Sequence, residues 1–114
     1  DPARVVGLFD IFALSSVSEQ FPLSVVEAMA AGLPVASTDV GDIRAILAPA
    51  HAALLTPPGD PPALGQTLAA LAADPALRAR LGEANRTRAR AEFDIAAMLA
   101  AYESVYARAM GRAF

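Results

Sequence analysis

A short apolar run, a helix and a second short apolar run constrain this fold more than any other feature. Residues 9–16 are almost continuously apolar, which is typical of a strand buried on both faces. Pro22 suits the first turn of a helix that residues 23–31 continue until Gly32 ends it, and residues 34–38 form a second strand. Strands joined through a helix make right-handed crossovers, so the sequence predicts an α/β fold with a parallel sheet.

The rest of the chain is predicted to add a third strand and further helices. Aspartates mark most of the helix starts, because their side chains accept from the first backbone N–H groups, and Asp60 and Asp74 each precede a proline. The expected strand covers residues 52–56. The expected helices cover residues 43–47, 61–73, 75–91 and 95–110. About three strands make a thin sheet for a doubly wound domain, so we expect further strands before Asp1.

Composition excludes several classes of function. The chain has 114 residues, of which 55% are hydrophobic and 18% are charged, so it has the size and character of one folded domain. Its net charge of -3 argues against a nucleic-acid partner, which would require clustered positive charge. The absence of cysteine and a single histidine argue against thiolate or histidine-rich metal sites. No apolar stretch approaches the roughly 20 residues of a membrane span, so we expect a cytoplasmic protein.

The turn between the first strand and its helix is the expected ligand site. Ligands of open α/β sheets bind outside the carboxyl ends of the strands. Unpaired N–H groups at a helix start lie at the positive end of the helix dipole and hold phosphate. Because Pro22 has no N–H, the expected donors are the amides of Phe21, Leu23 and Ser24, with the Ser24 hydroxyl as a further contact.

Two carboxylates bracket this turn. Glu19 precedes the helix and Glu27 lies eight positions later, so they flank the phosphate site instead of neutralising it. The neighbours of Glu27 along the chain are apolar, and an unpaired carboxylate in such surroundings needs a partner. A diol is suitable, since each hydroxyl donates to a carboxylate oxygen. A solvated helical glutamate and a capping glutamate are the alternatives that the spacing leaves open.

The segment from Phe12 to Ser37 resembles the Glu-x7-Glu region of family 4 (group 1) glycosyltransferases. The resemblance continues through residues 39–42, residues 55–60 and the terminal helices as far as Tyr106, and therefore covers most of the chain. It implies a GT-B enzyme, in which two Rossmann-like domains close over the substrates. The donor binds mainly to the C-terminal domain, and this chain is expected to be part of that domain, with its C-terminal helices packing on the sheet.

The resemblance implies a role for each site residue. Glu27 would hold the ribose hydroxyls of the nucleotide, and Glu19 would be the catalytic residue beside the transferred sugar and its hydroxyls. The amides of Phe21, Leu23 and Ser24 would bind the diphosphate. Pro22 departs from the glycine that is common in the family, and residues 41–45 (Gly-Asp-Ile-Arg-Ala) depart from its Gly-Gly-x-Pro-Glu pattern.

The resemblance also implies a retaining transfer of a hexose from an NDP-sugar, with no metal or other cofactor. The basic side chains that stabilise the departing diphosphate would lie before Asp1. We therefore expect residues 1–114 to be a single, incomplete nucleotide-sugar-binding domain that does not transfer sugar alone. The acceptor, whether a saccharide, a lipid-linked compound or a small molecule, is not identified by the sequence. A non-catalytic nucleotide or phosphosugar module, or an interaction fragment that self-associates through an exposed sheet edge, are the alternatives.

Other conspicuous residues have plainer interpretations. His51 has the chemistry of a general base, but it lies in a loop far from the turn, and we interpret it as non-catalytic. Tyr102 and Tyr106 are one helical turn apart and are expected to make core or interdomain contacts. Five arginines crowd one helix, which indicates a solvated helix more than a patch that makes the whole protein peripheral to a membrane. They are Arg78, Arg80, Arg86, Arg88 and Arg90.

Overall fold

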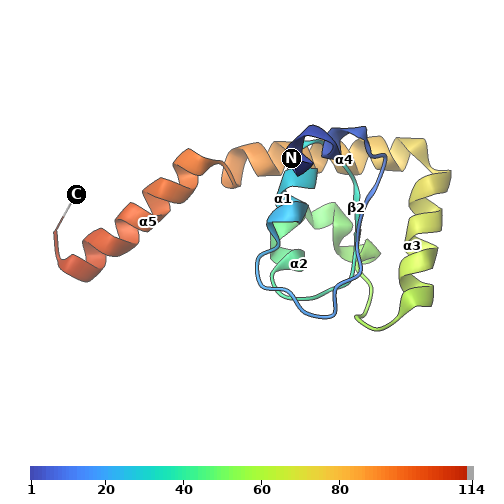
Figure 1. Cartoon of the computed structure of the whole chain (residues 1–114), viewed down its shortest axis with the longest axis horizontal. Coiled ribbons are helices and arrows are strands. Elements are labelled where there is room, and N and C mark those ends of the chain that lie inside the picture. Colours follow the sequence, from blue (N-terminus) through green and yellow to red (C-terminus); the bar gives the residue numbers. More distant parts are fainter. Residues whose placement is uncertain (113–114) are drawn as a thin grey trace.

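The computed structural model describes residues 1–112 and confirms the expected α/β class. Its strands are β1 (Phe12–Leu14) and β2 (Val35–Ser37). Its α-helices are α1 (Leu23–Ala30), α2 (Ile43–Ile46), α3 (Pro61–Ala73), α4 (Pro75–Glu92) and α5 (Ile95–Met110). Short 3-10 helices cover Pro2–Arg4, Val6–Leu8 and Pro49–Leu54. In Figure 1, β2 lies between α1 and α3, both of which contact it, and α4 runs across one end of this arrangement.

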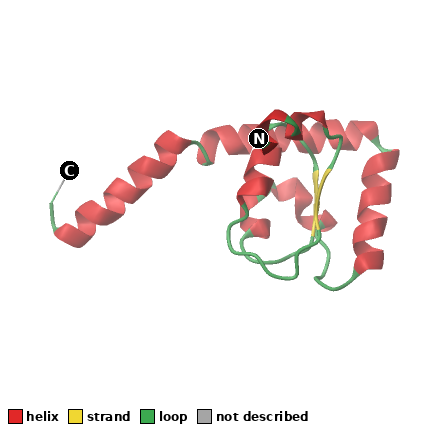
Figure 2. Ribbon diagram, in the orientation of Figure 1, coloured by secondary structure: helices red, strands yellow, loops and turns green. Residues whose placement is uncertain are grey.

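The two strands form the parallel pair that the sequence predicts. Phe12 lies opposite Val35 and Leu14 lies opposite Ser37, and the pair is the only sheet drawn in Figure 2. Within residues 1–112, β1 is paired along one edge only, by β2. The self-association expected of an exposed sheet edge stays a prediction.

The third expected strand, over residues 52–56, is wrong for most of its length. Pro49–Leu54 is a 3-10 helix, and only Thr56 joins the sheet, through a single parallel bridge to Thr38. The segment is apolar because it is rich in alanine, which has little preference for strands, and Pro49 suits a helical first turn. Apolarity alone does not separate a short strand from a buried helical turn.

Three helices begin at the residues that the sequence predicts. The side chains of Asp60, Asp74 and Asp94 each accept from the backbone N–H three residues later, at 3.0, 2.9 and 2.6 Å. These caps satisfy N–H groups that have no partner within the helix. Prolines fill the first positions of α3 and α4, where a missing N–H costs nothing.

Two apolar clusters fill the space around the sheet. The larger one lies between α1, β2 and α2 and includes Val25, Met29 and Ile43, all fully buried. The smaller one joins β2 to α3 and α4 through Ala36, Leu64, Leu71 and Leu81. The leucines of α3 and α4 therefore face the core, and burying side chains of this size stabilises the fold by about 2 kcal/mol each.

The backbones of α1 and α4 meet at two glycines. A Cβ at Gly82 would overlap the carbonyl oxygen of Gly32 and lie 3.0 Å from its carbonyl carbon. Gly32 itself has a φ of 77°, a left-handed conformation that suits glycine at the end of α1. The close contact holds α4 against the helix that follows β1.

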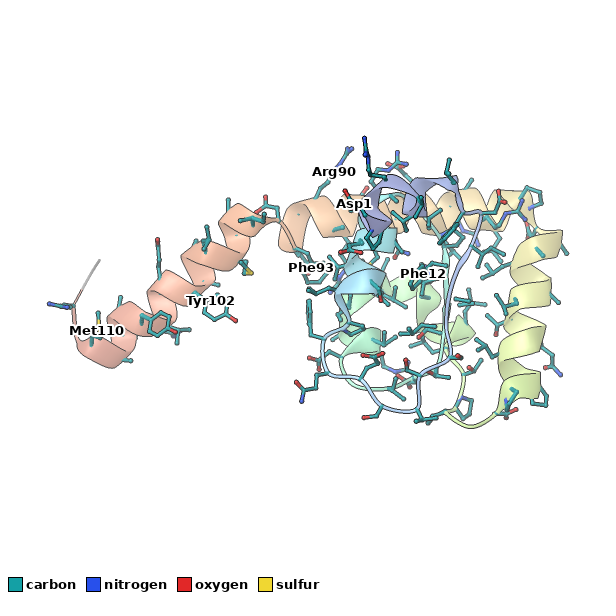
Figure 3. The ribbon with its side chains drawn as sticks, viewed as in Figure 1. Asp1, Phe12, Arg90, Phe93, Tyr102 and Met110 are labelled. Atoms are coloured by element: carbon teal, nitrogen blue, oxygen red, sulfur yellow. The ribbon has the colours of Figure 1, made fainter. Side chains whose placement is uncertain are left out.

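Helix α5 departs from the expectation that the C-terminal helices pack on the sheet. It extends away from the rest of the molecule (Figures 1 and 3), and none of its residues is buried. Tyr102 and Tyr106 are 57% and 56% exposed, so their expected core contact is wrong, while the interdomain alternative stays a prediction. The apolar spacing of α5 indicates a face to be covered, but spacing does not specify what covers it.

Candidate functional site

The carboxyl ends of β1 and β2 bring two loops together. The β1–α1 loop (residues 15–22) is tied to the β2–α2 loop (residues 38–42) by two hydrogen bonds. Thr38 Oγ1 donates to the carbonyl oxygen of Ser16 at 2.6 Å. The N–H of Asp42 donates to the carbonyl oxygen of Gln20 at 2.9 Å. Parallel strands place their carboxyl ends at one edge, which is why segments far apart in sequence meet here.

Gly41 allows the two loops to approach. Its φ is 53°, and a Cβ at this position would overlap the carbonyl oxygen of Glu19 and lie 2.7 Å from that of Gln20. Only a residue without a side chain fits both the conformation and the space. This contact of Gly41 was not predicted from the sequence. The available signal was a glycine shortly after the carboxyl end of a strand.

Glu19 is half-buried and has an oriented carboxylate. Its Oε1 accepts from Ser16 Oγ at 2.6 Å. The hydrogen bond is charge-assisted and holds one carboxylate oxygen in place. Glu19 was among the site residues predicted from the sequence, whereas Ser16, three residues earlier in the same loop, was not.

Helix α1 begins without a capping side chain. Pro22 is its N-cap, one position earlier than the first-turn place expected of it, and the first helical bond runs from the N–H of Val25 to the carbonyl of Pro22 at 3.2 Å. Leu23 and Ser24 occupy the first two helical positions, and both are exposed. Helices α3, α4 and α5 are capped by aspartates, so α1 differs by leaving its first amides to solvent or ligand.

The Phe21 side chain anchors the same loop to the far end of α4. Its ring packs edge-to-face on Phe93, with ring centroids 5.8 Å apart and an angle of 74° between the planes. Figure 3 shows Phe93 at the junction of α4 and α5. Such aromatic pairs contribute about 1 kcal/mol beyond the area they bury. The contact fixes the position of Phe21, whose backbone N–H lies shortly before the start of α1.

The position of Glu27 corrects one step of the sequence argument. Val25, Ala28 and Met29 face the core and are fully buried, whereas Glu27 is exposed on the opposite side of α1. The expectation that apolar neighbours enclose this carboxylate is wrong, because residues adjacent in a helix point in different directions. The Glu27 carboxylate is accessible to a ligand, but because it is exposed to solvent it does not need a partner.

Two cavities lie near the fold's loops and helices, and one of them borders the turn. One of about 500 Å³ separates the β1–α1 loop from the start of α3, and another of about 680 Å³ borders α4 and Pro49. Neither is lined by Glu19, Phe21, Leu23, Ser24 or Glu27. The candidate site is therefore an exposed helix start flanked by two carboxylates, and the neighbouring cavity was not expected from the sequence.

His51 is a buried structural residue. The N–H of Val35 donates to His51 Nε2 at 3.3 Å, and Asn85 Nδ2 lies 3.2 Å from the same nitrogen. Asn85 also accepts from the N–H of Ala48 at 3.2 Å and donates to the carbonyl of Leu33 at 2.9 Å. His51 is 0% exposed, which agrees with the interpretation that it is not catalytic.

Burial lowers the pKa of His51 below its usual value of 6.5, and a hydrogen bond with the Ala48 backbone opposes part of this shift. The unfolded chain takes up a proton near pH 6.5 that the folded chain does not, so we expect stability to fall as the pH drops below that value, by at most about 1.4 kcal/mol per pH unit. Urea unfolding between about pH 7.5 and 5.5 measures the slope. A His51→Gln variant should be less stable but have a flatter profile, and an equal slope in both proteins would contradict this account.

The arginines of α4 do not form one exposed face. Arg78 Nη1 donates to the carbonyls at the end of α3, including that of Leu71 at 2.7 Å. Arg88 donates to the Ala45 carbonyl at 2.7 Å, whereas Arg90 points away from the body in Figure 3. The solvated-helix interpretation therefore holds for part of the set, and several members instead pack against neighbouring elements. None of the helices described is both long enough and apolar enough to cross a bilayer.

Comparison with known proteins assigns the chain to a transferase family. The family model described as "Glycosyl transferases group 1" matches residues 1–88. The chain belongs to this family. The resemblance found in the Glu-x7-Glu segment is thereby confirmed.

The curated relatives are longer glycosyltransferases. The chain is 37% identical over 101 residues to D-inositol 3-phosphate glycosyltransferase of Streptomyces bingchenggensis, an alignment that covers 88% of this chain and 22% of the relative. It is 29% identical over 104 residues to N-acetyl-alpha-D-glucosaminyl L-malate synthase of Bacillus anthracis, covering 91% of this chain and 27% of the relative. The chain thus spans about a quarter of the length of these relatives.

A solved structure confirms the fold class. Sucrose-phosphate synthase from Thermosynechococcus elongatus superimposes with a TM-score of 0.81 and 32% sequence identity. The match covers 90% of this chain and 26% of that protein, a GT-B glycosyltransferase. The small parallel sheet with its flanking helices is therefore the GT-B type of α/β fold that the sequence predicts.

Proposed function

We propose that the turn from Glu19 to Glu27 binds the NDP-sugar donor of a retaining glycosyltransferase that transfers a hexose to an acceptor. The observation that carries this proposal is the start of α1. The first amides of this helix, at Leu23 and Ser24, are left without a capping side chain at an exposed position between two carboxylates. Membership of the glycosyltransferase family supports a donor as the ligand of such a site.

The diphosphate is the group that suits the helix start. Its negative charge faces the positive end of the α1 dipole, and its oxygens accept from the amides of Phe21, Leu23 and Ser24. These donors are fixed by the backbone before the reaction starts, so they stabilise the charge that builds on the departing diphosphate without reorganising. In this proposal the amides fill this role without a metal.

The two carboxylates recognise the two ends of the donor. Exposed Glu27 accepts from the ribose hydroxyls, and half-buried Glu19 accepts from hydroxyls of the transferred sugar beside the anomeric carbon. In a retaining transfer, the bond from the anomeric carbon to the diphosphate oxygen breaks and a bond to the acceptor oxygen forms on the same face. The proton of the acceptor hydroxyl leaves with the nucleoside diphosphate.

We further propose that residues 1–114 are an incomplete C-terminal domain. The basic side chains that accompany the amides at the diphosphate and the domain that binds the acceptor would lie in the preceding region of the full-length protein. The saccharide, lipid-linked and small-molecule acceptor classes stay open. We expect no transfer when the 114-residue chain is mixed with an NDP-sugar and an acceptor, and detection of a glycosylated product would contradict this division of roles.

Removal of the Glu27 carboxylate tests the nucleotide site. In the full-length protein, Glu27→Ala is expected to weaken binding of UDP, GDP or ADP about ten- to hundredfold, because hydrogen bonds to a charged group contribute about 1.5–3 kcal/mol. Isothermal titration calorimetry measures the dissociation constants. Glu103→Ala removes an exposed helical carboxylate on α5 and serves as the matched control. Equal affinities in wild type and Glu27→Ala would contradict the ribose assignment.

A further inference from the structure

We propose that Thr38 and Ser16 are positioning residues that orient the Glu19 carboxylate toward the transferred sugar, and that they do so independently of nucleotide binding. The inference rests on the proposed role of Glu19. It adds two residues to the donor site that the Glu-x7-Glu spacing does not contain. The hydrogen bonds run from Thr38, directly after β2, through the β1–α1 loop to the carboxylate.

Thr38 is the fixed end of this connection. It is 3% exposed, and its N–H donates to the carbonyl of Leu14 at 3.1 Å while its backbone bridges to Thr56. The residue is therefore held by the sheet on both sides. Its hydroxyl donates to the Ser16 carbonyl at 2.6 Å, which fixes the peptide unit that follows Ser16.

Ser16 transmits this position to the carboxylate. Its Oγ donates to Glu19 Oε1 at 2.6 Å, a short bond of the kind made to ionised oxygens. This bond holds the carboxylate in one orientation, so its remaining lone pairs, including those of Oε2, face a fixed direction of approach. A carboxylate held in a fixed orientation selects sugars that present a hydroxyl in that direction.

The backbone beneath Glu19 is held from a second side. The Asp42 N–H binds the Gln20 carbonyl at 2.9 Å, and Gly41 lies directly against the Glu19 carbonyl. None of these contacts involves the N–H groups of Leu23 and Ser24. Loss of the Thr38 or Ser16 hydroxyl should therefore release Glu19 while leaving the diphosphate site in place.

The separation of sugar and nucleotide binding gives a test that needs no acceptor. For the full-length protein, calorimetry yields dissociation constants for UDP, GDP and ADP and for UDP-glucose, UDP-N-acetylglucosamine, GDP-mannose and ADP-glucose. The affinity gained from the sugar is the dissociation constant of the nucleoside diphosphate divided by the dissociation constant of the corresponding NDP-sugar. We expect Ser16→Ala and Thr38→Val to reduce this ratio about tenfold, the effect of losing one hydrogen bond to a charged group, and to leave the diphosphate affinity within about twofold.

Conservative variants distinguish positioning from general damage. Thr38→Ser and Ser16→Thr keep the hydroxyls and should restore most of the sugar-dependent affinity lost in Thr38→Val and Ser16→Ala. Equal weakening of diphosphate and NDP-sugar would assign Thr38 and Ser16 a merely structural role and overturn the inference, as would unchanged ratios. Glu27→Ala in the same titration reports on the proposed function itself. If Glu27→Ala binds every diphosphate as wild type does, or if wild type binds no probe, the donor site fails and the inference fails with it.

Discussion

Replacing Gly82 by alanine is expected to destabilise the domain by about 3 kcal/mol or more, at the upper end of what overpacking costs. The added Cβ would overlap the Gly32 carbonyl oxygen, which belongs to the backbone and cannot rotate away as a side chain does. The overlap can be relieved only if α4 moves away from α1. This movement disturbs the core and also α1, whose first residues form the proposed donor site. Urea unfolding followed by circular dichroism measures the change in the free energy of unfolding.

Gly65→Ala is the matched control for this prediction. Gly65 is also a helical glycine, in α3, but a Cβ there would meet nothing within 4 Å. Alanine has the higher helix propensity, so this variant should be more stable than wild type by about 0.5–1 kcal/mol. Similar changes in the two variants would show that the close contact at Gly82 does not govern its effect.

Gly41→Ala is expected to have the largest effect on the proposed donor site. Its Cβ would overlap the Glu19 carbonyl oxygen, and its φ of 53° adds a left-handed strain of about 1–2 kcal/mol. The β1–α1 loop must then shift away from the β2–α2 loop and move Glu19 with it. A displacement of about 1 Å in a reacting arrangement lowers turnover about a hundredfold. Donor hydrolysis or sugar transfer by the full-length protein measures this loss.

Gly59→Ala is the control that separates the effect of left-handed backbone strain from the effect of displacing the β1–α1 loop. Gly59 has a φ of 77°, yet a Cβ there would meet nothing within 4 Å. The variant carries the same kind of backbone strain without the overlap, so it should lose about 1–2 kcal/mol of stability and retain turnover. If Gly59→Ala loses as much activity as Gly41→Ala, the contact between Gly41 and Glu19 is not what holds the site.

Features set by neighbours in the sequence could be predicted. Asp60, Asp74 and Asp94 reach amides three residues away, so the chain itself specifies where α3, α4 and α5 begin. The parallel pairing of β1 and β2 followed from the helix between them. The Glu-x7-Glu segment indicated the family for the same reason, because its whole pattern lies within one loop and one helix.

Features set by distant contacts could not be predicted in this way. The 3-10 helix Pro49–Leu54 places His51 against Asn85, 34 positions away, and an apolar run of alanines carries no trace of that pairing. The contact of Gly41 with Glu19 likewise exists only after β1 and β2 have paired. Exposure of Glu27 depends on which face of α1 meets the core, and its immediate neighbours along the chain led to the wrong expectation.

If the start of α1 binds the donor diphosphate, a bound nucleotide will be located there. Amide proton–nitrogen spectra recorded during titration with UDP, GDP and ADP report each backbone N–H separately. We expect one of these nucleotides to produce its largest shifts at Phe21, Leu23 and Ser24. Largest shifts around the cavity at Gly59 and Gly65, with those three amides unmoved, would contradict it.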